Sequence, residues 1–219
     1  MKIKYSLKFM LLAVFALLFS FMPLSQVMAA DLSTPEQAIE QASNKLKVKM
    51  QDPGFTKDFK QITVFVEETI YPHVDFDRIS ALVLGKNWKS ASETEKTQFK
   101  QEFKTLLVRT YSRAFIEFKD WSVQFLPVTK DENPDKVIVN TEVLQPGRKA
   151  ISVNYRMMKN GNEWKAYDIL IEGVSLVTNY RSSFKSDIDR TGSLASVIES
   201  LAKRNKEALS KNPLAKDAS

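Results

Sequence analysis

The chain has 219 residues and a formal net charge of +6. Hydrophobic residues make up 43% and charged residues 26%, which is typical of a globular protein and not of a disordered one. It contains no cysteine and one histidine, His73. This composition excludes disulfides, thiolate metal sites, thiol nucleophiles and any histidine-rich metal centre.

The first thirty residues have the pattern of a secretory signal. Three lysines precede an apolar run over residues 9–22, and Val27-Met28-Ala29 places small or permissive residues at the expected cleavage site. The run is shorter than the roughly 20 residues that a bilayer span requires. We expect residues 1–29 to be removed and an exported, soluble chain to begin at Ala30 or Asp31. Loss of three lysines and no acids lowers the net charge from +6 to +3, which favours an anionic membrane surface or an acidic protein over nucleic acid.

Four helices are expected between residue 34 and about residue 118. The helix-stopping pair Pro53-Gly54 separates the first two, and Gly85 closes the third. The fourth begins at a capping box formed by Ser92 and Glu95 and runs to about Phe118. The residues expected to cap helix starts in this region are Thr34, Asp75 and Ser92.

The hydrophobic period then changes from that of a helix to the alternation of a strand. Turn signals at Pro146-Gly147 and Asn160-Gly161 separate alternating segments, and a fourth strand is expected over residues 163–172. Two further helices follow Gly173, and the tail from about Ser210 is expected to fray. The sequence therefore predicts an α+β fold with a helical N-terminal part, a four-stranded antiparallel meander and two C-terminal helices.

The fourth strand is apolar on both of its expected faces. Alternation places Tyr167, Ile169 and Ile171 on one face, and Trp164, Ala166 and Leu170 on the other. Such a sheet must be covered on both sides or must line an apolar space. We expect a cavity between the sheet and the long helix, with these lining candidates: Phe103, Leu107, Tyr111, Phe115, Trp121, Val139, Val153, Tyr155, Tyr167, Ile169 and Ile171.

Three features could support catalysis, and each also has a structural interpretation. Gly173-Val174-Ser175 resembles a nucleophile elbow without its second glycine, and a helix N-cap at Ser175 is favoured. His73 could form a base dyad with Asp75 or Asp77, or lie in a surface connection. Asp168 could be a general base of raised pKa, or could accept hydrogen bonds from the backbone or Arg181. The alternative to a binding protein is thus a small exported enzyme with Asp168 or His73 as its base.

Several blocks of the chain resemble one known family. The longest is Val74-Asp75-Phe76-Asp77-Arg78-Ile79-Ser80-Ala81-Leu82-Val83-Leu84-Gly85, followed by Trp88. Further blocks are Trp164-Lys165-Ala166-Tyr167-Asp168, Glu172-Gly173-Val174-Ser175 and Asn179-Tyr180-Arg181 with Phe184. They resemble the MlaC or toluene-tolerance family, the periplasmic phospholipid-binding component of the Mla lipid-asymmetry ABC transport system.

The resemblance implies a non-enzymatic carrier of glycerophospholipid in the periplasm, with the lipid as cargo and no other cofactor. It implies exchange with an outer-membrane lipoprotein–porin complex and with an inner-membrane ABC transporter that bears a substrate-binding ring. We expect a monomer that touches membrane surfaces transiently and maintains outer-membrane lipid asymmetry.

The implied fold joins helices to a nuclear-transport-factor-like or cystatin-like sheet. Residues 30–219 would then form one phospholipid-binding domain, with a helical subdomain over about 30–118 and 174–210 and a sheet subdomain over about 119–173. A structural adaptor between the two membranes, without lipid cargo, is a third possibility.

Overall fold

The structure is a computed structural model that describes residues 34–117 and 120–211, all within the compact unit Leu32–Ser219. The expected signal segment, Phe118 and the end of the C-terminal tail lie outside the described residues. Within residues 34–117 and 120–211, no helix is both long and apolar enough to cross a membrane.

The helices of the N-terminal half follow the expected order, with one helix subdivided and two short helices, η2 and α5, that were not expected. The expected second helix is split at Asp58, whose side chain accepts hydrogen bonds from the backbone N–H groups of Lys60 and Gln61 and so starts a new helix. The elements are α2 (Thr34–Lys49), η1 (Phe55–Lys57), α3 (Phe59–Thr69), η2 (Tyr71–His73), α4 (Phe76–Leu84), α5 (Lys86–Ser90) and α6 (Glu93–Glu117).

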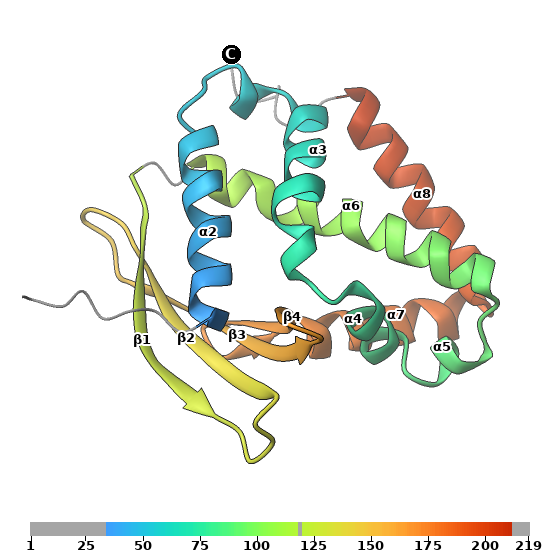
Figure 1. Cartoon of the computed structure of the whole chain (residues 1–219). Coiled ribbons are helices and arrows are strands. Elements are labelled where there is room, and N and C mark those ends of the chain that lie inside the picture. Colours follow the sequence, from blue (N-terminus) through green and yellow to red (C-terminus); the bar gives the residue numbers. More distant parts are fainter. Residues whose placement is uncertain (1–33, 118–119, 212–219) are drawn as a thin grey trace, which may run out of the picture. The chain divides into compact units, whose positions relative to one another are not determined.

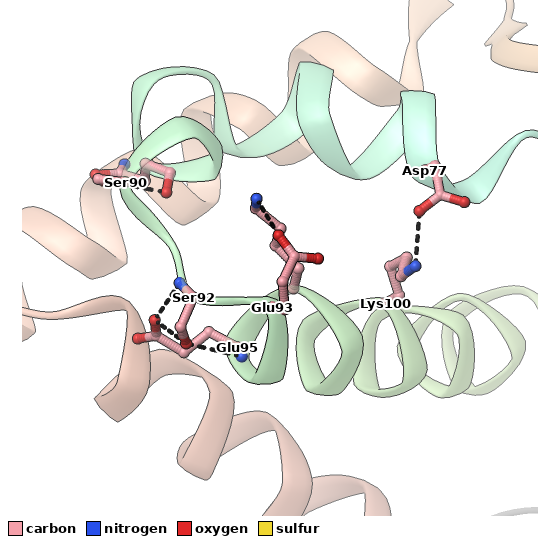
Figure 2. Close-up of polar contacts among 8 residues, drawn as sticks. Asp77, Ser90, Ser92, Glu93, Glu95 and Lys100 are labelled. Atoms are coloured by element: carbon pink, nitrogen blue, oxygen red, sulfur yellow. Dashed lines mark hydrogen bonds and ion pairs between the residues drawn. The ribbon is translucent and has the colours of Figure 1, made fainter.

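The caps predicted at α4 and α6 are confirmed. The Asp75 carboxylate accepts a hydrogen bond from the Arg78 backbone N–H, and this bond begins α4. At the start of α6, the Ser92 hydroxyl accepts from the Glu95 N–H, and the Glu95 carboxylate accepts from the Ser92 N–H (Figure 2). An ion pair of 2.6 Å between Lys100 and Asp77 then ties α6 to α4 (Figure 2).

Within the described residues the sheet has five strands, in the order β1-β2-β3-β4-β5, with all neighbours antiparallel. The sequence predicted four. The fifth is a short strand, Val174–Ser175, which returns after the Gly173 turn and pairs with Leu170 and Ile171. Two residues are too few to give an alternation signal in sequence. The other strands are β1 (Ser122–Lys130), β2 (Lys136–Leu144), β3 (Ile151–Asn160) and β4 (Glu163–Ile171).

A β-bulge in β4 changes which residues share a face. Asp168 pairs with Arg156 and Ala166 pairs with Met157, so Tyr167 is the extra residue between them. Cross-strand partners point to the same side of a sheet. The prediction that Trp164 and Ala166 lie opposite Ile169 and Ile171 is therefore wrong, because the bulge brings all four onto one face.

Two helices follow the sheet, α7 (Leu176–Thr191) and α8 (Leu194–Lys211). The predicted N-cap at Ser175 is confirmed, since its hydroxyl accepts a hydrogen bond from the Thr178 N–H. Gly192 adopts the left-handed conformation at φ 83° and ends α7.

The hydrophobic interior divides into separate clusters. Phe99, Phe103 and Phe184 lie in a helical core built by α4, α6, α7 and α8. A second cluster joins η1, α3, α6 and α8. A third lies where α2 packs against the sheet beside β1 and β2 (Figure 1), and its buried members are Ile39, Val139, Met157 and Ala166.

Candidate functional site

One face of the sheet carries an apolar band that includes most of the predicted lining. Val139 pairs with Tyr155, Tyr155 pairs with Ile169, and Val153 pairs with Ile171, so these five side chains lie on the same face. The register adds members that sequence analysis missed. Val143 pairs with both Val123 and Ile151, which extends the band to a fourth strand, β1.

This band is covered unevenly. At one end Val139 is 0% exposed beneath α2, together with Met157 and Ala166. At the other end the band's members are only half-buried: Val123, Val143, Ile151, Val153, Ile169 and Ile171. Covering apolar surface is favourable by roughly 25 cal/mol per Å². The half-buried end is therefore the candidate contact surface for an apolar ligand.

Tyr155 lies between the covered and the half-covered ends of the band. Burial raises the pKa of its phenol to about 12, while its side chain keeps some accessible surface. Tyr155 packs against the covered cluster on one side, so it marks the boundary between the covered end of the band and the half-buried end.

The candidates on α6 are distributed differently. Phe103 is 1% exposed and packs against Phe99, Tyr180 and Phe184, so it belongs to the helical core and not to the sheet cluster. Leu107 is half-buried at the edge of that same core.

Three further candidates, Tyr111, Trp121 and Tyr167, are not members of the apolar band. Burial and a hydrogen bond with Tyr180 raise the pKa of the Tyr111 phenol above its usual value, which links α6 to α7. Trp121, just before β1, is 6% exposed. Tyr167 occupies the bulge, and the side chain of Phe115 lies outside the described residues.

Asp168 has the geometry of a structural carboxylate. It is 3% exposed, and it accepts hydrogen bonds from the Arg156 guanidinium at 3.1 Å, the Ser175 hydroxyl at 2.7 Å and the Val177 N–H at 3.1 Å. The expected backbone donor is present, but the arginine is Arg156 and not Arg181. These bonds tie β3, β4 and the start of α7 together, with the negative charge at the helix N-terminus, where it is stabilised.

Arg181 serves another place in the fold. Its guanidinium lies against Gly85, where an added Cβ would come within 3.3 Å of a guanidinium nitrogen. Gly85 has a φ of 56°, a backbone conformation that favours glycine.

His73 is placed away from a carboxylate dyad. Burial lowers its pKa, as does the positive charge of Lys45 and Lys165, while Glu163 opposes the shift. Both expected partners are engaged elsewhere, since Asp75 caps α4 and Asp77 pairs with Lys100. The lowered pKa favours the neutral imidazole, and Glu163, the acidic group whose charge acts on it, is itself paired with Lys165.

The described residues, 34–117 and 120–211, contain no group of three or more His, Asp or Glu side chains that could hold a metal ion.

Fold and site together define an α+β protein in which, among the described residues, one apolar sheet face is buried beneath α2 at one end and half-buried at the other. The MlaC family profile matches residues 40–203. Because the match spans most of its length, the chain belongs to the MlaC family.

Two curated relatives and one solved structure are similar to the chain. The intermembrane phospholipid transport system binding protein MlaC of Haemophilus influenzae is 21% identical over 73% of this chain and 77% of its own. The toluene tolerance protein ttg2D of Pseudomonas putida is 25% identical over 55% of this chain and 56% of its own. A phospholipid-binding protein from Ralstonia solanacearum, solved in complex with a phospholipid, aligns with a TM-score of 0.74 and 26% identity, over 84% of this chain and 100% of its own.

Proposed function

We propose that this protein is a periplasmic carrier that holds a glycerophospholipid by its acyl chains and takes it between the inner and outer membranes. The observation that carries the proposal is the half-buried apolar band on a sheet whose fold is shared with a lipid-bound relative. The signal pattern of residues 1–29 and the word "intermembrane" in the Haemophilus influenzae relative's name support the periplasmic location.

Such a carrier must offset a large free energy of exposing acyl chains to water. A diacyl lipid has about 30 methylenes, and at about 0.8 kcal/mol each their exposure to water costs on the order of 20 kcal/mol. An apolar cavity removes this cost, while the headgroup can stay in water. We propose the half-buried end of the band as its floor, with Val153, Tyr155, Ile169 and Ile171 from the original candidates and Val143 and Ile151 added by the register.

The other candidates remain part of the proposal at its margins. Leu107, Tyr111 and Phe115 of α6, Trp121 before β1 and Tyr167 at the bulge would line the walls. Phe103 and Val139 are fully buried in packed clusters, so we assign them to support behind the lining.

Loading and release require partners. A partner can shift the equilibrium between the empty and the lipid-loaded carrier only as far as it binds one of these states more tightly than the other. Transfer of lipid to an acceptor therefore requires an acceptor that binds the empty carrier more tightly, and loading requires a donor that binds the loaded carrier more tightly. We propose an outer-membrane lipoprotein–porin complex and an inner-membrane ABC transporter for these roles, with the chain acting as a single-domain monomer.

We propose that the protein is not an enzyme. Asp168, the strongest candidate base, accepts hydrogen bonds from a guanidinium, a hydroxyl and a backbone amide, and these contacts favour a structural role for its carboxylate. The two acidic partners expected for His73 are bonded elsewhere, since Asp75 caps α4 and Asp77 pairs with Lys100.

The lining can be tested by filling it. Val153→Trp adds volume at the half-buried end of the band, so we expect it to lower phospholipid uptake from vesicles severalfold while the protein keeps a cooperative thermal melt. Val64→Trp is the matched control, because Val64 is 46% exposed on α3 and outside the band. Uptake is measured by separating protein from vesicles and quantifying bound lipid by mass spectrometry.

Either of two results contradicts the proposed lining. One is a Val153→Trp protein that takes up as much lipid as the Val64→Trp control. The other is a Val153→Trp protein destabilised by about 1–3 kcal/mol whose folded fraction still carries a full load, which is the response of a filled core.

A further inference from the structure

The Tyr155 hydroxyl is a polar group placed in apolar surroundings without a partner. It has no hydrogen-bond partner among residues 34–117 and 120–211. Its direct cross-strand neighbours, Val139 and Ile169, are aliphatic. Removing a hydroxyl from water without a compensating hydrogen bond is unfavourable, so a ligand that supplies an acceptor here gains affinity.

Thr141, on the same face, shows how the sheet treats a hydroxyl that has no ligand role. Thr141 is 0% exposed, and its hydroxyl donates to the backbone carbonyl of Val153 at 2.5 Å. That group is satisfied within the protein. Among the described residues of this part of the band, Tyr155 therefore presents the hydroxyl that is free to bond to a cargo.

The chemistry of the cargo limits which of its atoms could accept this bond. This step rests on the proposed function. The charged phosphate of a glycerophospholipid is strongly hydrated and stays near water, and the acyl chains consist of methylenes that accept no hydrogen bond. Between them lie the ester carbonyls, which are uncharged acceptors at the boundary of the apolar and polar parts.

We propose that the Tyr155 hydroxyl donates a hydrogen bond to an ester carbonyl of the bound lipid and so makes the site selective for ester-linked over ether-linked phospholipids. Tyr155 is then a specificity-determining residue, and it also sets how deep the lipid sits. A site with a hydrogen-bonding group discriminates strongly against an analogue that lacks the matching atom, because the site's own group is then left unpaired.

The test is a competition between two lipids that differ only in this linkage. Vesicles contain equal amounts of diacyl and dialkyl phosphatidylcholine with equal chain lengths, and lipid bound to the protein is quantified by mass spectrometry. We expect the wild-type protein to be enriched about tenfold in the ester lipid. Tyr155→Phe keeps the ring and removes the hydroxyl, so its bound lipid should return to the ratio in the vesicles.

The matched control is Tyr71→Phe, since the Tyr71 hydroxyl is already bonded to the Lys104 carbonyl at 2.6 Å and lies outside the band. It should keep the wild-type enrichment. A wild-type protein that takes up both lipids in the vesicle ratio overturns the inference and leaves the carrier function standing. So does a Tyr155→Phe protein that loses both lipids equally. A wild-type protein that takes up neither lipid contradicts the proposed function itself.

Discussion

At the scale of single residues, the roles of the chain's polar groups follow from their partners and not from their residue types. Asp168 and Tyr155 lie on opposite faces of the same sheet, because Asp168 pairs with Arg156, the residue after Tyr155. Asp168 has three donors, whereas the Tyr155 hydroxyl has no partner among the described residues. The first is therefore fixed by the fold, and the second is available to a ligand.

The structural role of Asp168 predicts a loss of stability when its charge is removed. Asp168→Asn replaces an acceptor of three hydrogen bonds with a group that carries its own donors, so we expect unfolding to be easier by about 2–4 kcal/mol. Asp187→Asn is the control, because Asp187 pairs with Arg190 on the exposed side of α7 and such a pair contributes about 0–1 kcal/mol. Urea denaturation measures both.

A general base would behave differently. The enzyme alternative predicts that Asp168→Asn keeps wild-type stability and lipid load but loses an enzymatic activity. That result would refute the structural role assigned to Asp168.

At the scale of elements, α6 organises the helical part of the molecule. Phe99 and Phe103 of α6 lie in the helical core, while Val108, further along the same helix, belongs to the cluster with η1, α3 and α8. The Asn205 amide of α8 also donates to the Glu102 carbonyl of α6 at 2.9 Å. Because α6 contributes to two hydrophobic clusters, we expect a change at its first turn to affect the stability of the whole helical part.

The capping box of α6 gives a prediction for this element. Ser92→Ala removes the acceptor of the Glu95 N–H, so we expect a loss of about 1 kcal/mol in the free energy of unfolding. Ser90→Ala, two residues earlier in α5, is the control, since the Ser90 hydroxyl donates to the Asn87 carbonyl on an exposed surface (Figure 2). Equal thermal midpoints for the two variants would contradict the assigned cap.

Local signals made most of the elements predictable from sequence. Asp75, Ser92 and Ser175 are short polar residues just before helical patterns, and each caps its helix as predicted. A turn joins β3 to β4 at the predicted place, although its two central residues are Gly161 and Asn162, because Asn160 still pairs with Glu163.

The sequence could not predict the position of a side chain where that position depends on residues far away in the chain. The bulge at Tyr167 reverses the facing of Trp164 and Ala166, and alternation alone carries no signal of an inserted residue. Phe103 has the same helical spacing whether it meets the sheet or the helices, and its stacking on Phe99 and Phe184 decides between them. Arg181 was the arginine partner expected for Asp168 from the sequence, whereas the register of β3 and β4 places Arg156 directly opposite it.

At the scale of the whole described unit, the tightly packed clusters and the candidate binding surface lie in different parts of the fold. The two helical clusters and the covered end of the sheet are packed with buried residues such as Phe59, Phe99 and Val139. The half-buried apolar band remains at the other end of the sheet. A fold held together in this way can bind and release an apolar ligand without losing its core.

The central claim is that this protein carries a phospholipid, and its cargo tests that claim most directly. The full chain is expressed in a Gram-negative host, and the purified protein is analysed by native mass spectrometry, with extracted lipids identified in parallel. The account predicts a mass increment equal to a bound glycerophospholipid, lost on extraction and restored by incubation with vesicles. A folded protein that carries no lipid and takes none from vesicles would contradict it.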